Sequence, residues 1–471
     1  MRIVLVNPPL KLPKSWGVPS VSQNLGLMYV ASALRSQGHG VKVIDAVGEN
    51  WKQIVETEDS YYCGMGFKDI IKAASTFDPQ VVGISSTFTV NAQTVKNLIL
   101  DLKQEMPTVK VMVGGPDVTV RPREYDMTDY IVLGEAEDTM KDFAYTHVHF
   151  QKFTENLDEL AFPARDLFPM QEYFKAYDQG RACRNKYVAD RRWTTMVTTR
   201  GCPYNCVFCS VHLSMGRKLR KRSIENVEAE INELVKGKLR IKHINFEDDN
   251  ISLDQAFFRN FLEMLGQYDV SWSLPNGIRA DTLNEETVRA MSRTGCSRLF
   301  VAPEVGVQRV LTEIVHKNMQ LSAVEKAVKL FVRYGIKVDA TFIIGFIGET
   351  KKDIVDTIRY ACKLKRLGVD GTAISIAAPL YGTELYQQAV AGGYISEDFD
   401  LSQMSPFESV ISTEQFSSDW ILWARDFSKW YVNLQDWFKP LSTAKMLLVN
   451  PRQAYSFCRF WTRYILPKIL R

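Results

Sequence analysis

Three cysteines lie close together in the middle of this chain, at Cys202, Cys206 and Cys209, with the spacing C-x₃-C-x₂-C. The sequence has 8 cysteines in 471 residues, so chance would place such a triplet only about 0.002 times in the chain. Three thiolates at this spacing can bind three irons of a cubane iron–sulfur cluster. No fourth cysteine follows at ligand spacing, so one iron is left open to bind a small molecule and pass it an electron.

A zinc site and a group of buried core cysteines are the alternatives. Structural zinc is usually held by four Cys or His ligands in a tetrahedron. His212, three residues after Cys209, is the only candidate nearby for a fourth ligand. We therefore favour the cluster.

The elements that position this loop belong to more than one domain, because 471 residues exceed one ordinary core. Hydrophobic residues make up 46% and charged residues 24%, which is ordinary for a globular protein. The apolar start ends at Pro8-Pro9 and predicts a buried strand, not a signal peptide. No apolar run is long enough to span a membrane. Free thiols at the cluster require a reducing setting, which predicts a cytoplasmic protein.

Residues 1–145 alternate short apolar strands with helices. This alternation predicts an α/β domain with a doubly wound parallel sheet. Helical periodicity places Leu27, Val30, Ala31 and Leu34 on one face. The expected strands are residues 3–6, 41–44, 81–85, 111–113 and 131–133. Sheets of this kind bind ligands beyond the carboxyl ends of their strands.

Small and polar residues follow those strands. Ser86 and Thr87 come after the third expected strand, Gly115 after the fourth, and Glu135 after the fifth. Glycine and polar residues are also common in ordinary loops, so each position alone is a weak signal. Together they predict a ligand cleft along this edge of the sheet.

Residues 146–190 are expected to form a linker, and residues 191–385 a second α/β domain. Six strand–helix units predict a partial (β/α)₆ barrel whose active site lies at the carboxyl ends of the strands. The expected strands are residues 195–199, 241–246, 272–276, 298–301, 338–344 and 372–376.

Residues able to bind a polar ligand follow these strands. Glu247 opens a run of four polar residues that could bind amino and hydroxyl groups of a cofactor, or could cap the next helix. Arg279 and Glu304 follow the third and fourth strands. Gly345 and Glu349 follow the fifth, where glycine allows close approach of an adenine; a plain Gly-x-x-Gly turn is the alternative.

The cysteine motif, with the aromatic Phe208 just before its last cysteine, resembles that of the radical S-adenosylmethionine enzymes. The resemblance implies that the open iron of a [4Fe-4S] cluster chelates S-adenosylmethionine. It also implies cleavage of this molecule to methionine and a 5′-deoxyadenosyl radical. Arg279, Glu304 and residues 345–349 are then expected to bind S-adenosylmethionine. Ala302 departs from the Gly-x-Glu that most relatives have at this point.

Residues 1–145 resemble the cobalamin-binding domain that precedes many of these enzymes. The resemblance rests on the strand-end loops and on the segment 36–41, Ser-Gln-Gly-His-Gly-Val. It implies cobalamin near Ser86, Thr87 and Gly115. The Asp-x-His-x-x-Gly motif, whose histidine ligates cobalt in other cobalamin domains, does not occur here. We therefore expect cobalamin without a lower protein ligand.

Residues 386–471 form a helical, basic and tryptophan-rich region. Five of the nine tryptophans follow residue 419, and residues 437–471 contain seven Lys or Arg and no Asp or Glu. This composition predicts a peripheral anchor on an anionic membrane, with a lipophilic substrate. A helical lid is the alternative, because Trp423, Trp430 and Trp437 recur every seven residues, as in packed helices.

The sequence thus predicts a cobalamin-dependent radical S-adenosylmethionine enzyme that methylates an unactivated carbon of a small, lipophilic biosynthetic intermediate. As the resemblance implies, one S-adenosylmethionine would supply the methyl group of methylcobalamin, and another the radical. An electron donor such as flavodoxin or ferredoxin is expected. No general base stands out.

Three other interpretations were weighed. The same cofactors could drive ring closure or oxidation without methyl transfer. A methylthiolating tRNA enzyme would need three more cysteines upstream, where only Cys63 and Cys183 occur. A corrinoid carrier or sensor would not need an open iron. No nucleic-acid partner is expected, because the basic run at residues 217–222 is short and lacks aromatic residues.

Overall fold

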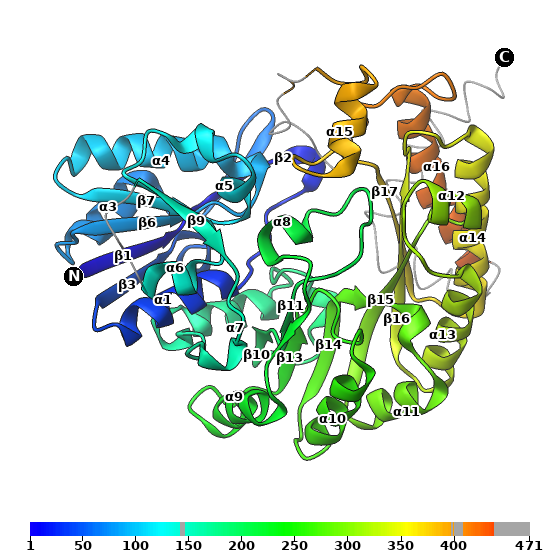
Figure 1. Cartoon of the computed structure of the whole chain (residues 1–471), viewed down its shortest axis with the longest axis horizontal. Helices are drawn as coiled ribbons and strands as arrows, with labels where there is room; N and C mark the ends of the chain where they lie inside the picture. Colours follow the sequence, from blue (N-terminus) through cyan, green and yellow to red (C-terminus); the bar gives the residue numbers. More distant parts are fainter. Residues whose placement is uncertain (142–146, 397–398, 400–407, 438–471) are drawn as a thin grey trace.

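The computed structural model describes the chain except residues 142–146, 397–398, 400–407 and 438–471. Two six-stranded sheets, both covered by helices, are joined by a linker (Figure 1). The α/β architecture predicted from the sequence is confirmed for both parts of the chain.

The N-terminal sheet has the strand order β3-β1-β6-β7-β8-β9, and all its pairs are parallel. Its strands are β1 (Arg2–Asn7), β3 (Gly40–Asp45), β6 (Val81–Ser85), β7 (Lys110–Gly114), β8 (Tyr130–Gly134) and β9 (Val148–Lys152). The sheet thus continues past residue 145, since β9 pairs with β8.

Alternate side chains of β1 enter two different cores. Ile3 and Leu5 pack with α1 (Leu25–Ser36), whereas Val4 and Val6 pack with α3 (Phe67–Ser75) and α4 (Ala92–Glu105). A parallel strand with both faces buried reads as a continuous apolar run, as this one does. Short helices α5 (Pro116–Val120) and α6 (Ala136–Lys141) follow β7 and β8.

A small antiparallel sheet lies beside the first one, and it was not expected from the sequence. It consists of β2 (Leu10–Pro13), β5 (Ser60–Cys63) and β4 (Ile54–Glu56). Asn91, directly before α4, holds this sheet against the N-terminal domain: its side-chain oxygen accepts from the Lys11 N–H of β2 at 3.0 Å, and its amide donates to the Pro9 carbonyl at 3.0 Å.

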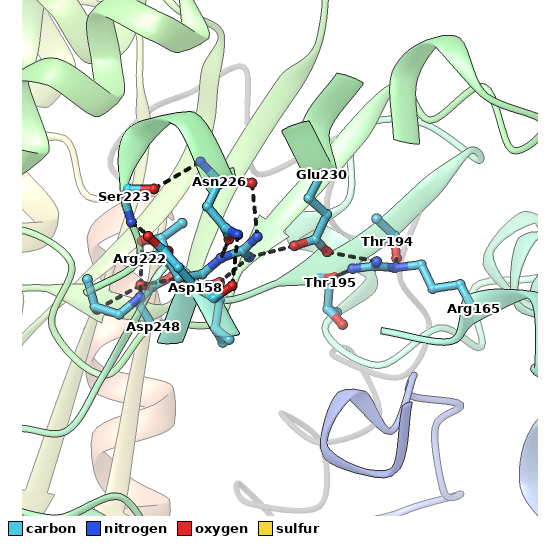
Figure 2. A network of polar contacts seen from close by, with 12 residues as sticks. Asp158, Arg165, Thr194, Thr195, Arg222, Ser223, Asn226, Glu230 and Asp248 are labelled. Atoms are coloured by element: carbon cyan, nitrogen blue, oxygen red, sulfur yellow. Dashed lines mark hydrogen bonds and ion pairs between the residues drawn. The ribbon is translucent and has the colours of Figure 1, made fainter. Parts of the chain in front are cut away.

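The linker is structured and anchored to both domains. It contains η4 (Leu157–Glu159), η5 (Arg165–Leu167), α7 (Met170–Asp178) and η6 (Asn185–Tyr187). The hydroxyl of Tyr173 donates to Asp45 of the N-terminal sheet. Earlier in the linker, Arg165 binds the barrel domain through an ion pair with Glu230 at 2.8 Å, and Glu230 also binds Arg222 (Figure 2).

The second sheet is the predicted partial barrel of six parallel strands in sequential order. Its strands are β10 (Trp193–Met196), β13 (His243–Phe246), β14 (Ser271–Ile278), β15 (Cys296–Glu304), β16 (Lys337–Ile344) and β17 (Gly371–Ile376). Its helices are α9 (Ile224–Lys236), α10 (Gln255–Leu265), α11 (Glu285–Arg293), α12 (Gln308–Glu313), α13 (Leu321–Arg333) and α14 (Lys351–Leu367).

A two-stranded ribbon, which was not expected, closes the loop that carries the three cysteines. Strand β11 (Thr199–Arg200) pairs antiparallel with β12 (Arg220–Lys221), so that Arg200 lies opposite Arg220. Residues 201–219 leave and return through this ribbon, and they include α8 (Val211–Met215). In Figure 1, α8 lies between the N-terminal sheet and the barrel.

The C-terminal region is helical where the structure describes it, as predicted. Helix α15 (Glu384–Ala391) follows the barrel, and α16 (Ser418–Trp437) packs against α14 and β17. No helix among the described residues has the length and apolar character to cross a membrane. Trp461 and the basic tail lie outside the described residues.

Candidate active site between the two sheets

A cavity of about 490 Å³ lies between the two sheets. One wall comes from the carboxyl ends of β6, β7 and β8, and the other from β10, β13 and β14 of the barrel. Strand ends of parallel sheets are where both of these folds bind ligands.

Small residues line the N-terminal wall at the strand ends, among them Ser85, Thr87, Gly114, Gly115 and Gly134, beside larger side chains from the same domain. Gly115 has φ +118°, and a Cβ atom there would lie 2.5 Å from the carbonyl oxygen of Ser86. Glycine is therefore required at this turn, and no side chain projects from it into the cavity. A ligand can approach the backbone closely at this point.

The predicted residues Thr87 and Gly115 line this wall, but Ser86 lies behind it. The Ser86 hydroxyl is 2.9 Å from that of Tyr125 and 3.5 Å from an Asp117 oxygen, inside the domain. Ser85, which the sequence analysis missed, lines the cavity. The two-residue alternation of a strand continued to its end would have found Ser85.

On the barrel wall, Glu247 and Asp249 line the cavity, and Asp248 and Asp249 also bind the start of the cysteine loop. Asp248 accepts hydrogen bonds from the backbone and hydroxyl groups of Thr198 and Thr199, and Asp249 accepts one from the Gly201 N–H at 3.0 Å. Burial raises the pKa of Glu247 to about 7, opposed by the charge of Arg184.

Two buried polar atoms on the same wall have no hydrogen-bond partner among the described residues. They are the indole N–H of Trp193 and the hydroxyl of Thr195, and both residues line the cavity. Buried polar groups are normally paired, so these two indicate a ligand in the cavity. The cavity therefore fits a ligand that offers polar groups to the barrel side.

The three cysteines of the loop are partly buried and close enough to influence one another electrostatically. Burial, followed by the Cys206 and Cys202 thiols, raises the pKa of Cys209 to about 12. No three His, Cys, Asp or Glu side chains in the described part of the chain form a group for a single metal ion. A cubane cluster does not require convergence on one point, since each thiolate binds a different iron. The donor set therefore fits three irons of such a cluster.

Arg279 braces the cysteine loop. Its guanidinium lies 3.8 Å from the ring centroid of Tyr204, within the loop, and pairs with Asp281 at 2.7 Å. A further N–H donates to the Asn318 carbonyl at 2.7 Å. The structure thus places Arg279 beside the cluster position with most of its donors already bound.

Glu304 lies beside Cys206 and is paired with Lys317 at 2.7 Å. Lys317 also donates to the Ala302 carbonyl at 2.7 Å. The sequence analysis missed Lys317, because it follows a short helix and belongs to no strand end. Glu304 has φ +65°, an uncommon backbone conformation for a residue with a side chain, and one often found at functional sites.

The loop after β16 also reaches the cysteine segment. The Phe208 ring lies 5.9 Å from that of Phe346, between centroids. One Glu349 oxygen accepts from the N–H groups of Gly345 and Phe346 at 2.7 and 2.8 Å, while the other has no partner in the described structure. Burial raises the pKa of Glu349 to about 8. Glu349 thus closes its own loop.

The structure therefore divides the predicted site residues into two groups. Thr87, Gly115 and Glu247 line the cavity; Phe208, Arg279 and Glu304 lie at the cysteine loop. Glu135 borders both, as its side chain reaches Arg220 at the base of the loop.

Known protein families match both halves of this site. The B12 binding domain matches residues 18–144, and the radical SAM superfamily matches residues 196–361. The solved structure of the radical S-adenosylmethionine methyltransferase TsrM from Kitasatospora setae shares the fold. Its TM-score is 0.63 at 15% identity, over 83% of this chain and 76% of that one.

Two relatives match nearly the whole chain. The uncharacterized methyltransferase PH0819 of Pyrococcus horikoshii is 30% identical over 89% of this chain and 90% of its own length. The cytidylyl-2-hydroxyethylphosphonate methyltransferase of Streptomyces wedmorensis is 26% identical over 87% of this chain and 86% of its own.

The chain belongs to the family of radical S-adenosylmethionine enzymes that carry a cobalamin-binding domain. It is thus an enzyme of the methyltransferase type. Its cofactors are a [4Fe-4S] cluster, S-adenosylmethionine and cobalamin, as the sequence predicted.

Proposed function

We propose that this enzyme methylates a carbon atom of a small molecule bound in the cavity between the two sheets. The observation that carries the proposal is that one cavity has a cobalamin-domain wall and a barrel wall, next to the cysteine loop. The names of PH0819 and of the phosphonate enzyme, both methyltransferases, support it. When bound, the cofactors supply a methyl group and a carbon radical able to abstract hydrogen.

The residues of the chain bind and orient these groups. Cys202, Cys206 and Cys209 would hold three irons and leave one open for S-adenosylmethionine. Glu304, with Lys317 beside it, and the loop 345–349 are proposed to contact that molecule. Arg279 would keep the loop in place through its contact with Tyr204. Thr87, Gly115 and the strand-end turns around them are proposed to face the corrin.

The barrel wall favours a substrate that carries polar groups. Trp193 offers an unpaired N–H donor, Thr195 a hydroxyl, and Glu247 a carboxyl group. Related enzymes named for a cytidylyl phosphonate, a bacteriochlorophyllide and a hopanoid span polar and lipophilic substrates. We propose a partly apolar molecule with at least one hydroxyl, amine or carbonyl group.

A peripheral membrane contact through the C-terminal region is a separate proposal. Helix α16 carries a row of aromatic rings in mutual contact, Trp420, Trp423 and Phe427 among them. The basic composition of residues 438–471 adds charge of the sign that anionic lipids attract. Sedimentation with phosphatidylglycerol vesicles, compared with phosphatidylcholine vesicles, tests this contact; equal recovery in both pellets would contradict it.

The methyltransferase proposal is tested on protein reconstituted anaerobically with iron, sulfide and hydroxocobalamin. S-adenosylmethionine and titanium(III) citrate are added, and 5′-deoxyadenosine and S-adenosylhomocysteine are quantified. We expect both products, and we expect Cys206→Ala to abolish 5′-deoxyadenosine, because one cluster ligand is lost. 5′-Deoxyadenosine alone would favour ring closure or oxidation. Neither product, with the iron content confirmed, would favour a corrinoid carrier.

A further inference from the structure

Four charged side chains meet where the N-terminal sheet contacts the base of the cysteine loop. Glu135 lies between β8 and α6, Glu137 lies in the first turn of α6, and Arg200 and Arg220 come from the ribbon β11–β12. We call these four residues the interdomain charge cluster. All four side chains are buried, with exposed fractions between 2% and 8%.

The contacts within the interdomain charge cluster are close, and the one between Glu135 and Arg220 is bidentate. Both oxygens of Glu135 accept from Arg220, each at 2.7 Å. Glu137 accepts from Arg200 at 2.8 Å, and Glu135 lies 3.5 Å from Arg200. Arg200 also lies over the ring of Tyr29, 4.8 Å from its centroid. Each arginine of the ribbon is thus held by a carboxylate of the other domain.

Electrostatics explains why the ribbon needs these carboxylates. Arg200 and Arg220 are direct partners across the antiparallel pair, so two positive charges are buried side by side. Like charges directly opposite on neighbouring strands destabilise a sheet. Burying an unpaired charge costs several kcal/mol. Glu135 and Glu137 neutralise both charges, so the ribbon is held against the N-terminal sheet.

The interdomain charge cluster borders both parts of the site. On one side, Cys202 follows Arg200 by two residues, and Arg220 donates to the Met215 carbonyl at 2.6 Å, at the end of α8. On the other side, Gly134, Glu135 and Glu137 line the cavity wall formed by the cobalamin domain, and Arg200 lines the cavity as well. The same four residues therefore connect the cluster-binding loop to the cobalamin wall.

We propose that the interdomain charge cluster fixes the position of the iron–sulfur site relative to cobalamin. The four residues are positioning residues, since they act through the ribbon and the strand-end turn. This inference rests on the proposed function, because it concerns methyl transfer between the two sites. In this proposal, Glu135 holds the two domains in a fixed relative position and does not bind a cofactor directly.

The two reactions of S-adenosylmethionine depend differently on that relative position. In methyl transfer, the sulfonium sulfur keeps the electron pair of the broken S–CH₃ bond. The pair for the new bond comes from cobalt, which titanium(III) citrate has reduced. This step requires the iron–sulfur site and the cobalamin wall to be held in a fixed relative position. Reductive cleavage to 5′-deoxyadenosine takes one electron from the iron–sulfur cluster and does not involve the cobalamin wall. Loosening the charge cluster should therefore slow the first reaction more than the second.

The test compares Glu137→Gln with Glu230→Gln in the full chain, reconstituted as above. Glu230 is a matched control, because it is also a buried glutamate between two arginines, Arg165 and Arg222, but does not line the cavity (Figure 2). For Glu137→Gln we expect 5′-deoxyadenosine formation within twofold of the parent and the initial rate of S-adenosylhomocysteine formation at least fivefold lower. For Glu230→Gln the ratio of the two products should not change.

A second measurement does not depend on turnover. Amide hydrogen exchange of the protein without cofactors should show faster exchange at residues 199–202 and 215–222 in Glu137→Gln than in the parent. In the loaded protein, the magnetic coupling between the reduced cluster and cobalt(II) should be weaker, or spread over a wider range of strengths, in the same variant. Unchanged exchange together with unchanged coupling would overturn the proposal.

Loss of stability is separated from loss of the fixed relative position by a double variant, Glu135→Leu with Arg220→Met. It removes a buried ion pair without leaving one charge unpaired, a change that is often neutral for stability. We expect the double variant to retain iron and cobalamin but to show a ratio of S-adenosylhomocysteine to 5′-deoxyadenosine as low as that of Glu137→Gln. If the ratio instead equals that of the parent, the residues act only on stability. If the parent itself forms no S-adenosylhomocysteine, the proposed function fails, and hydrogen exchange and coupling still decide the positioning role.

Discussion

At the scale of single residues, Glu247 combines burial with a free carboxyl group that faces the cavity. Its pKa is raised from 4.5 to about 7 by burial, so the folded protein favours the neutral form. Above pH 7 the folded state must hold the charged form, and stability is lowest there. Between about pH 4.5 and 7, stability falls as the unfolded chain ionises while the folded one does not. Below about pH 4.5 the carboxyl group is neutral in both states, so it no longer changes the free energy of unfolding.

Glu247→Gln should therefore raise the melting temperature of the protein without cofactors at pH 8 and leave it unchanged at pH 4.5. The gain is bounded by about 3 kcal/mol, from the size of the pKa shift. Thermal melts followed by circular dichroism at both pH values measure it. Glu155→Gln, at an exposed ion pair with Lys218, serves as the control and should give no difference. An equal effect at both pH values would contradict the assigned ionisation.

Among the residues, the sequence could predict those whose spacing itself carries chemistry. The cysteines needed only their spacing, and Glu247 and Glu304 needed only a strand to precede them. The sequence pointed to Ser86 where the structure has Ser85, because the residue at which a strand ends decides which side chain faces the cavity. Lys317 had no signal, since its partner Glu304 is thirteen residues away in a different element.

At the scale of elements, the turn between β7 and α5 depends on Gly115. Its φ of +118° is a conformation found almost only in glycine, and a Cβ would meet the Ser86 carbonyl at 2.5 Å. Gly115→Ala should lower the free energy of unfolding by about 1–3 kcal/mol or more. It should also weaken hydroxocobalamin binding at least tenfold.

Equilibrium dialysis with hydroxocobalamin measures this loss. Gly38→Ala is the matched control, because Gly38 also has positive φ, at +80°, but its Cβ would meet nothing within 4 Å. That variant should lose some stability and bind normally. Normal binding by Gly115→Ala would show that the turn at Gly115 does not face the ligand.

The long elements were predictable and the short ones were not. Apolar runs and helical periodicity marked all six barrel strands and five of the six strands of the N-terminal sheet, but not β9. The ribbon β11–β12 has only two residues in each strand, too few for any periodicity. The antiparallel sheet of β2, β5 and β4 depends on pairing across fifty residues, which local patterns do not encode.

At the scale of the whole molecule, the site exists only where the two sheets meet. Sequence patterns identified each sheet separately, but the contact between them rests on pairs such as Glu137–Arg200, separated by 63 positions. When two charged residues lie far apart in the sequence, no local pattern shows that they will pair in the folded chain. The cavity and the interdomain charge cluster therefore emerged only from the folded chain.

A shared cavity predicts that one ligand stabilises both domains together. Hydroxocobalamin added to the protein should slow amide hydrogen exchange at the carboxyl ends of β6, β7 and β8, because it binds the folded form only. Exchange should also slow in β10 and β13, whose residues Trp193, Thr195 and Asn245 line the opposite wall. Helix α11 lies outside the cavity lining and serves as the internal control. Protection confined to the N-terminal sheet would mean that the barrel wall does not touch the corrinoid, leaving Trp193 and Thr195 to the substrate alone.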